Sequence, residues 1–258
     1  MLSKNKIKFI RSLERKKERN ESGLFLAEGN KLVADLLPYF SCELLVAKPS
    51  WMATQGDLKA KELIVADEND IEKASLLKNP QDVIAIFVQS EQILDKSLLQ
   101  NELNLALDGI QDPGNLGTII RIADWFGIHH VICSPDTADI YNPKTVQATM
   151  GSLARMQIFY ESLPELLTTL PDLPVYGTFL NGENIYTNTL TTNGLIVMGN
   201  EGNGIRPEVE KHINRRLYIP SFPLETDTAE SLNVAVATAI TCAEFRRQQV
   251  QSLGYTPI

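Results

Sequence analysis

Five polar residues of the C-terminal half lie in or beside three turns rich in glycine or proline. The turns are DPGNLG (112–117), GNEGNG (199–204) and the segment from Pro220 that ends in ESLN, and the polar residues are Asn115, Arg121, Glu201, Ser231 and Asn233. Each turn follows an apolar run that predicts a buried strand. One such turn alone is typical of an ordinary loop, but loops at one edge of a parallel sheet converge. The three together predict one pocket, in which glycine lets the backbone approach a ligand closely.

The stretch LALDGIQDPGNLGTIIRIADWFGIHHVICSP (105–135) predicts the unit that positions the first turn. An apolar run is followed by a turn, by apolar residues at helical spacing and by a second apolar run. Asn115 is predicted to cap the helix, and Gly127 to end it. Strand, helix and strand in this order predict a parallel sheet, whose ligands usually bind at the carboxyl ends of the strands. Asn115 and Arg121 are therefore expected to face that edge.

Several other kinds of site are disfavoured by the spacing of residues. Neither GxGxxG after the first strand nor GxxxxGK[ST] occurs, which argues against a nucleotide-dependent oxidoreductase and a P-loop. The pair His129-His130 has no third ligand in view, so we predict no metal. Trp51 and Trp125 are predicted to lie in the core.

Composition limits the class of protein. The chain has 258 residues, 43% hydrophobic content, a formal net charge of −8 and three widely spaced cysteines. No apolar run is long enough to span a bilayer, and the N-terminus lacks the apolar core of a signal peptide. Without a paired-cysteine pattern, a reducing cytoplasm is expected. The negative total charge argues against a generic nucleic-acid binder.

The N-terminal segment has the opposite charge. Residues 3–19 predict one amphipathic helix capped by Ser3, with eight basic residues against two glutamates. Such a local field attracts phosphates even in an acidic protein, although a solvated helix face explains the charges equally well. The candidates for contact with phosphates in this segment are Lys4, Lys8, Arg11, Lys16 and Lys17.

The order of predicted elements indicates an α/β protein of two domains. Short strands and helices alternate up to Gln89 and predict a small α/β domain over 1–95, followed by a polar linker. Residues 103–258 predict a larger domain with a parallel sheet and helices on both faces. The final helix, 231–249, is expected to bury Leu232, Val236, Ala239 and Ile240.

Three motifs in this order resemble those of the SpoU/TrmH family of RNA ribose methyltransferases. They are DGIQDPGNLGTIIRIADWFG, IVMGNEGNGI, and YIP followed by ESLNVAVATAI, and they span most of 108–240. The N-terminal part, with IRSLERKKERNESGLFLAEGNKLV, is similar to the small ribosomal-protein-like RNA-binding domain of many members. The sequence departs from the family pattern after Ile219-Pro220, where Ser221-Phe222 replaces the usual Met and the segment 221–229 before SLN is longer and more acidic. It also has Gln147 where a basic residue is common, which leaves Arg155 as the candidate for RNA contact there.

The resemblance implies the fold, the ligands and the reaction. The C-terminal segment would thread a loop to form a trefoil knot, an exception to the rule against threaded connections. Members are typically homodimers that bind S-adenosylmethionine through backbone groups. The residues implied for the cofactor are Gly199, Ile219, Leu232, Thr178 and Gly204, and those implied for catalysis and RNA contact are Asn115, Arg121, Glu201, Ser231 and Asn233.

The implied reaction is methyl transfer to a ribose 2′-hydroxyl, with ribosomal RNA favoured over transfer RNA. Family proposals make Arg121 the base, but a guanidinium is effectively always charged. Physical chemistry favours an Arg121 that holds a phosphate bidentately and stabilises the developing alkoxide. Glu201 would order its loop or hydrogen-bond Arg121, and a surface carboxylate without function stays an alternative. Rival functions are methylation of a base nitrogen or of transfer RNA, and a non-catalytic RNA-binding or assembly protein.

Overall fold

The computed structural model describes residues 2–90, 92–223 and 229–254, which form two compact units. Unit 1 consists of the N-terminal residues up to position 90 together with Asp139–Ala154. Unit 2 consists of Gln92–Ala138 and the residues from Arg155 onward. Part of the acidic segment 221–229, namely 224–228, lies outside the described residues. Within the described ranges, no helix is long and apolar enough to cross a membrane.

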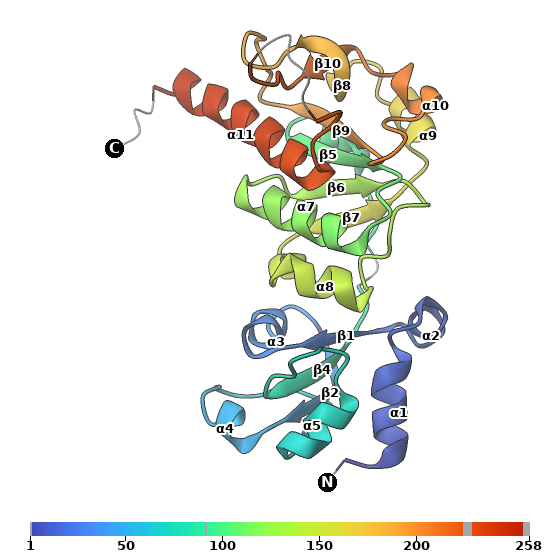
Figure 1. The fold of residues 1–258 in the computed structure, drawn as a ribbon, viewed down its shortest axis with the longest axis vertical. Coiled ribbons are helices and arrows are strands. Elements are labelled where there is room, and N and C mark those ends of the chain that lie inside the picture. Colours follow the sequence, from blue (N-terminus) through green and yellow to red (C-terminus); the bar gives the residue numbers. More distant parts are fainter. Residues whose placement is uncertain (1, 91, 224–228, 255–258) are drawn as a thin grey trace. The chain divides into compact units, whose positions relative to one another are not determined.

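Unit 1 is built on a four-stranded sheet, as the predicted small α/β domain requires (Figure 1). The strand order is β1-β4-β2-β3; β2 and β3 are parallel, and β4 is antiparallel to both of its neighbours. The strands are β1 (Leu24–Glu28), β2 (Cys42–Ala47), β3 (Glu62–Val65) and β4 (Val83–Val88). The helices are α1 (Lys4–Ser12), α2 (Lys16–Ser22), α3 (Asn30–Leu36), α4 (Pro49–Met52), α5 (Glu68–Ala74) and α8 (Pro143–Thr149), with a 3₁₀ turn at Ser152–Ala154.

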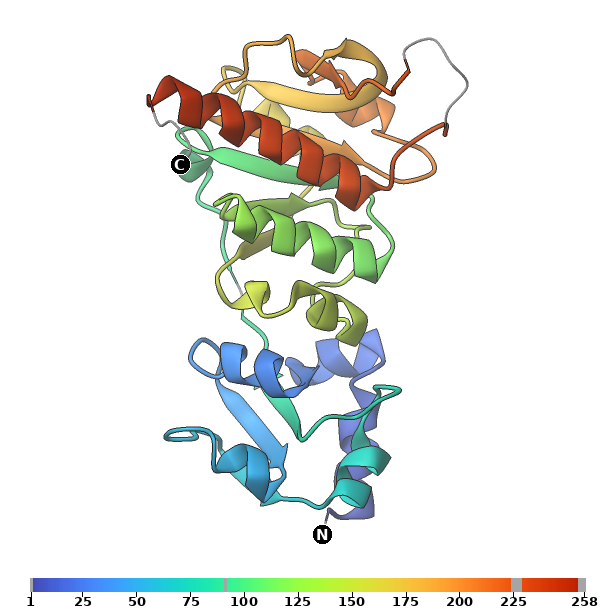
Figure 2. The same ribbon diagram turned by 60° about the vertical axis from the view of Figure 1, so that its left-hand side comes forward.

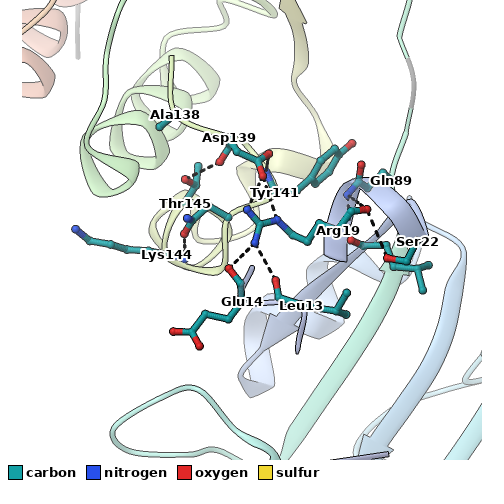
Figure 3. A network of polar contacts seen from close by, with 12 residues as sticks. Leu13, Glu14, Arg19, Ser22, Gln89, Ala138, Asp139, Tyr141, Lys144 and Thr145 are labelled. Carbon is teal, nitrogen blue, oxygen red and sulfur yellow. Dashed lines mark hydrogen bonds and ion pairs between the residues drawn. The ribbon is translucent and has the colours of Figure 1, made fainter. Parts of the chain in front are cut away.

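The prediction of a single helix over 3–19 is wrong, because the helix is interrupted between α1 and α2. Ser3 caps α1 as predicted, by accepting a hydrogen bond from the Lys6 amide. Arg19 lies in α2 with its side chain only 1% exposed. Its guanidinium donates to the Leu13 carbonyl at 2.9 Å and to the Glu14 carbonyl at 2.7 Å, at the break itself (Figure 3). These bonds satisfy carbonyls that would otherwise end α1 without partners.

Arg19 also ties a distant part of the chain into unit 1. The carboxylate of Asp139 accepts its Nε at 3.0 Å and its Nη2 at 2.6 Å, while the other carboxylate oxygen accepts the Tyr141 amide at 2.9 Å (Figure 3). The Tyr141 ring lies 4.7 Å from the ring of Phe25 on β1. Its hydroxyl donates to the Ser90 carbonyl at 3.1 Å. The segment Asp139–Ala154, which lies between two strands of unit 2 in sequence, thus completes the core of unit 1.

Unit 2 is a six-stranded sheet in which every paired strand is parallel, in the order β10-β8-β9-β5-β6-β7. The strands are β5 (Leu103–Asp108), β6 (His130–Cys133), β7 (Gln157–Tyr160), β8 (Val175–Asn184), β9 (Gly194–Gly199) and β10 (Arg215–Tyr218). The helices are α6 (Lys96–Leu99), α7 (Pro113–Trp125), α9 (Leu163–Thr168), α10 (Pro207–Glu210) and α11 (Val234–Ser252). The predicted parallel sheet is confirmed.

Helices cover both faces of this sheet, as predicted. Helices α7 and α11 lie side by side on one face, and both views show them running in the same direction (Figures 1 and 2). Helices α9 and α10 pack on the other face over Ala106, Ile132, Val175 and Val197. The start of α7 consequently lies at the carboxyl ends of the strands, where the sequence places the three turns.

The burial predicted for Leu232 and Val236 of the last helix is wrong, and Ala239 and Ile240 are only partly buried. Leu232, just before α11, is 50% exposed and Val236 is 49% exposed. The buried side of α11 instead contains Val234, Thr238, Cys242 and Phe245, and the Phe245 ring meets Tyr176 of β8 edge-on. Because α11 has apolar residues on both sides, its periodicity does not indicate which side faces the core. Trp125, also predicted in the core, is 84% exposed at the end of α7, whereas Trp51 is buried as predicted.

Candidate active site

The helix that follows the first turn begins three residues earlier than predicted, because its N-cap is Asp112 and not Asn115. The Asp112 side chain accepts the Asn115 amide at 2.8 Å, and Pro113 occupies the first helical position. Aspartate followed by proline is a favourable start for a helix, because proline has no amide hydrogen to satisfy there. The predicted capping role of Asn115 is therefore wrong. Its side chain is left available for other contacts.

Asn115 joins the three turns through two side-chain hydrogen bonds. Its Nδ2 donates to Oε1 of Glu201 at 2.7 Å, and its Oδ1 accepts Nδ2 of Asn233 at 3.1 Å. Asn233 in turn caps α11, since its Oδ1 accepts the amides of Ala235 at 2.9 Å and Val236 at 3.3 Å. The turns 112–117 and 199–204 and the segment before α11 therefore meet at one place, as the parallel sheet predicted. Glu201 contacts Asn115 rather than Arg121.

The second turn is a closed loop held by Asn200. The backbones of Asn200 and Gly204 exchange two hydrogen bonds, at 3.0 and 2.9 Å. The Asn200 side chain accepts the amides of Gly202 and Asn203 and donates to the Gly109 carbonyl at 2.7 Å, so it ties the loop to the end of β5. Asn200 is not among the site residues predicted from the sequence. Its signal was an asparagine directly after a buried strand and before a glycine-rich turn, where such side chains bond to nearby backbone.

Replacement of Gly199 by alanine tests this close packing. A Cβ there would lie 2.3 Å from the carbonyl carbon of Gly204 and 2.4 Å from the amide nitrogen of Ile205, so the backbone of the loop has to move. We expect a loss of about 1–3 kcal/mol in unfolding free energy. Thermal unfolding measures it, at roughly 2–4 °C for each kcal/mol. The matched control is Gly202→Ala, whose Cβ would meet a single atom at 3.5 Å and should be neutral. Equal melting temperatures for the two variants would contradict the prediction.

The residues predicted to bind a cofactor gather around the same edge. Thr178 lies in β8 and Gly199 ends β9, its neighbour, while Ile219 follows β10 on the other side of β8. The backbone at Gly204, with φ of 67°, has no atom within 4 Å of the position of a Cβ, so it faces open space. Leu232 is half exposed. Exposed loop backbone between apolar side chains fits a nucleoside that is held through backbone groups.

Of the five candidates, Arg121 and Ser231 take no part in the hydrogen bonds by which Asn115, Glu201 and Asn233 join the turns in the described structure. Arg121 is exposed on α7, six residues after Asn115 and so about 9 Å farther along the helix. Among the residues that the structure describes, it has no hydrogen bond or ion pair, so its guanidinium can bind a ligand. Ser231 is exposed before the start of α11.

The basic residues predicted to contact RNA have different surroundings in the two units. Lys4, Lys8, Lys16 and Lys17 are exposed in unit 1, and Lys17 lies 3.7 Å from Glu21. Arg11 instead donates to the Ser75 carbonyl at 2.6 Å, which ties α1 to the end of α5.

In unit 2, Arg155 pairs with Asp124 of α7, with Nε 3.1 and 3.2 Å from the two carboxylate oxygens. The four lysines are therefore better placed for RNA than either arginine.

Models of known protein families match residues in both units. The model of the SpoU rRNA Methylase family matches residues 102–243, and that of the MRM3-like substrate binding domain matches residues 4–85. The chain belongs to the SpoU rRNA methylase family. This confirms the family that the three motifs predicted.

Relatives of this SpoU family member match it over nearly its whole length. A 23S rRNA (guanosine(2553)-2′-O)-methyltransferase, RlmP of Bacillus subtilis, is 32% identical over 93% of this chain and 96% of its own. A solved TrmH-family structure from Porphyromonas gingivalis is 41% identical, with a TM-score of 0.86 over 96% of this chain and 99% of that one. The AdoMet-bound rRNA methyltransferase of Sinorhizobium meliloti is 33% identical, with a TM-score of 0.81 over 96% of each chain.

Proposed function

We propose that this SpoU family member transfers a methyl group from S-adenosylmethionine to a ribose 2′-hydroxyl of ribosomal RNA. The observation that carries the proposal is the hydrogen-bonded series Glu201–Asn115–Asn233, which joins three turns at the ligand-binding edge of a parallel sheet. The RlmP relative is named for this reaction on 23S rRNA, and the Sinorhizobium structure is described as AdoMet-bound.

The cofactor is assigned to the edge formed by β10, β8 and β9. Gly199, Gly204, Ile219 and Leu232 would hold it through backbone groups and apolar contact, with Thr178 beside them. When bound, it supplies a methyl carbon that is already strongly electrophilic. The protein then has to align the hydroxyl and assist loss of its proton. Asn115 and Asn233, whose amides are fixed by each other and by Glu201, are placed to orient the ribose.

Arg121 is assigned to the RNA phosphate and to the negative charge that develops on the ribose oxygen. The donor, held by Gly199, Gly204, Ile219 and Leu232, would supply the methyl group to the ribose oxygen and leave as a neutral thioether, while the hydroxyl proton would pass to phosphate or water. A guanidinium donates two parallel hydrogen bonds to a phosphate, and it stabilises an alkoxide without accepting a proton. Ser231 is assigned to the same pocket as a hydroxyl donor or acceptor.

Unit 1 is assigned to the RNA. Lys4, Lys8, Lys16 and Lys17 are exposed on α1 and α2 and provide the positive field that the acidic chain as a whole lacks. The MRM3-like substrate binding domain, which matches residues 4–85, supports this division. We place the RNA-binding domain at 1–95 and the catalytic domain at 103–258, with Asp139–Ala154 packed into unit 1. Three buried free thiols agree with the reducing cytoplasm expected from the sequence.

We also propose the trefoil knot and the homodimer that the family implies. The knot is supported by the path of the chain: β10 lies at the edge of the sheet, and α11 returns to pack on α7 and β9. The homodimer is supported by the outward apolar side of α7 and α11, where Trp125, Val236 and Val250 are 84%, 49% and 39% exposed. A second copy covering these side chains removes them from water.

The Val236→Asp substitution tests the homodimer. A carboxylate buried at an interface without a partner is costly, so we expect the variant to run as a monomer of about 28.7 kDa while the wild type runs at about twice that mass. Size-exclusion chromatography with light scattering measures both. Gln100→Asp, an exposed change away from α7 and α11, should leave the mass of the wild type unaltered. A monomeric wild type, or a dimeric Val236→Asp, would overturn the assignment.

Mapping of the methyl group tests the reaction. Ribosomal RNA from a deletion strain, incubated with the protein and S-adenosylmethionine, should gain resistance to cleavage at one 3′-linkage, because a 2′-O-methyl group blocks that cleavage. Primer extension locates the nucleotide. Methyl incorporation without resistance would assign the activity to a base nitrogen instead. Isothermal titration that detects no S-adenosylmethionine binding would favour a non-catalytic RNA-binding protein.

A further inference from the structure

The two ends of the loop 199–206 meet at the same residue of β5. Gly199 pairs with Asp108 in the parallel ladder of β9 and β5. Seven residues later the chain returns, and the Arg206 amide donates to Oδ2 of Asp108 at 2.8 Å. The Arg206 guanidinium donates to Oδ1 through Nε at 2.8 Å and also through Nη2. Asp108 thus closes the loop that carries Glu201 and Gly204.

The environment of Asp108 makes this closure strong. Its side chain is fully buried, and a buried carboxylate is stable only when it is paired and hydrogen-bonded. The planar guanidinium of Arg206 supplies two donors with fixed geometry, which an ammonium group does not. Asp136, at 3.4 Å, and Glu208, at 3.9 Å, also face the guanidinium. The hydrogen bond with Asp108 raises the pKa of Arg206, so the arginine stays charged.

The remaining contacts of the loop do not replace this closure. The bonds of Asn200 fix the tip of the loop, 200–204, to itself and to Gly109. Ile205 packs in the core below. Arg206 fixes the C-terminal end of the loop to Asp108 of β5, the strand that leads into the first motif. A shift at this end moves Gly204 and, through the backbone, Glu201 and its bond to Asn115.

We propose that Arg206 is a positioning residue for the methyl donor, which acts by holding the loop 199–206 on Asp108 in the conformation that binds S-adenosylmethionine. This inference rests on the proposed function for the identity of the ligand. Its structural part, the ordering of the loop by Arg206, does not. Arg206 is assigned no contact with the donor or the RNA.

Two measurements on Arg206→Ala test the proposal. Isothermal titration should show an S-adenosylmethionine Kd raised about tenfold, the loss expected when a charge-assisted contact that preorganises a site is removed. Steady-state kinetics should show the same rise in KM for the donor, with KM for RNA unchanged and kcat at saturating donor within about threefold of wild type. Arg206→Lys keeps the positive charge but lacks the two donors in fixed geometry, and it should restore part of the affinity for S-adenosylmethionine. If Arg206 only stabilised the fold, Arg206→Ala would lower the melting temperature without raising the KM for the donor selectively.

Hydrogen exchange separates the loop from the ligand. In the free protein, the amides of Gly202 and Gly204 should exchange about tenfold faster in Arg206→Ala, because both are bonded within the loop. The control is Arg215→Ala, an exposed arginine at the start of β10, which should change neither exchange nor Kd. If wild-type protein binds no S-adenosylmethionine, the proposed function fails while exchange still tests the loop. Unchanged loop exchange, or a Kd within twofold of wild type, overturns the role of Arg206.

Discussion

Arg121→Ala should lower the rate of methyl transfer about 10²–10³-fold, the cost of removing one preorganised donor from a developing oxyanion. The Kd for S-adenosylmethionine should stay within twofold of wild type, because Arg121 lies on α7, about two helical turns from Asn115 and outside the residues assigned to the donor. The exposed side chain has no hydrogen bond or ion pair among residues 2–90, 92–223 and 229–254, so its loss should not unfold the protein. Single-turnover assays with radiolabelled donor measure the rate.

Two further variants isolate the guanidinium of Arg121. Arg121→Lys should recover a small part of the rate, because an ammonium group binds phosphate as a point charge but not bidentately. Lys96→Ala removes the same charge from an exposed position of α6 and should be as active as wild type. Transfer by Arg121→Ala at a rate near that of wild type would show that the assignment is wrong.

Arg19→Ala should destabilise unit 1 by about 3–5 kcal/mol, the range for removal of one partner from a buried ion pair. The substitution leaves the Asp139 carboxylate without its cation and the Leu13 and Glu14 carbonyls without donors. The matched control is Arg15→Ala, whose ion pair with Glu18 is exposed and should contribute at most about 1 kcal/mol.

Tryptophan emission can report on unit 1 separately. The chain has two tryptophans, and Trp51 is buried in unit 1. In a Trp125→Phe background, urea unfolding followed by Trp51 emission should have a clearly lower midpoint for Arg19→Ala, and nearly the original midpoint for Arg15→Ala. Similar midpoints for the two variants would mean that the network in Figure 3 contributes little to stability.

Local patterns predicted the strands and the convergence of the three turns. Apolar runs identify buried strands, and the alternation of strand and helix fixes a parallel sheet, which brings loops after different strands to one edge. The contacts of Asn115 with Glu201 and Asn233 follow from that geometry. The helix start at Asp112 was also present in the sequence, but Asp-Pro-Gly is equally typical of a turn.

Long-range pairs account for most of what the sequence did not predict. The break between α1 and α2 contains neither proline nor glycine, and it is stabilised by Arg19, whose partner Asp139 is 120 residues away. Asp108 and Arg206 are 98 residues apart, and neither shows its partner in the local sequence. The outward side of α11 is as apolar as its inward side, so hydrophobic periodicity is ambiguous there.

The origin of unit 1 from two separate stretches has a consequence for synthesis of the chain. Ribosomes release the N-terminal residues first, but Tyr141 and the carboxylate that pairs with Arg19 emerge only after β5, α7 and β6. Until then, Phe25 can pack against the rings of Phe40 and Phe87 but lacks the Tyr141 ring. A nascent fragment that ends at the linker should therefore be sensitive to protease and bind chaperones, whereas one extended past Ala154 should resist digestion.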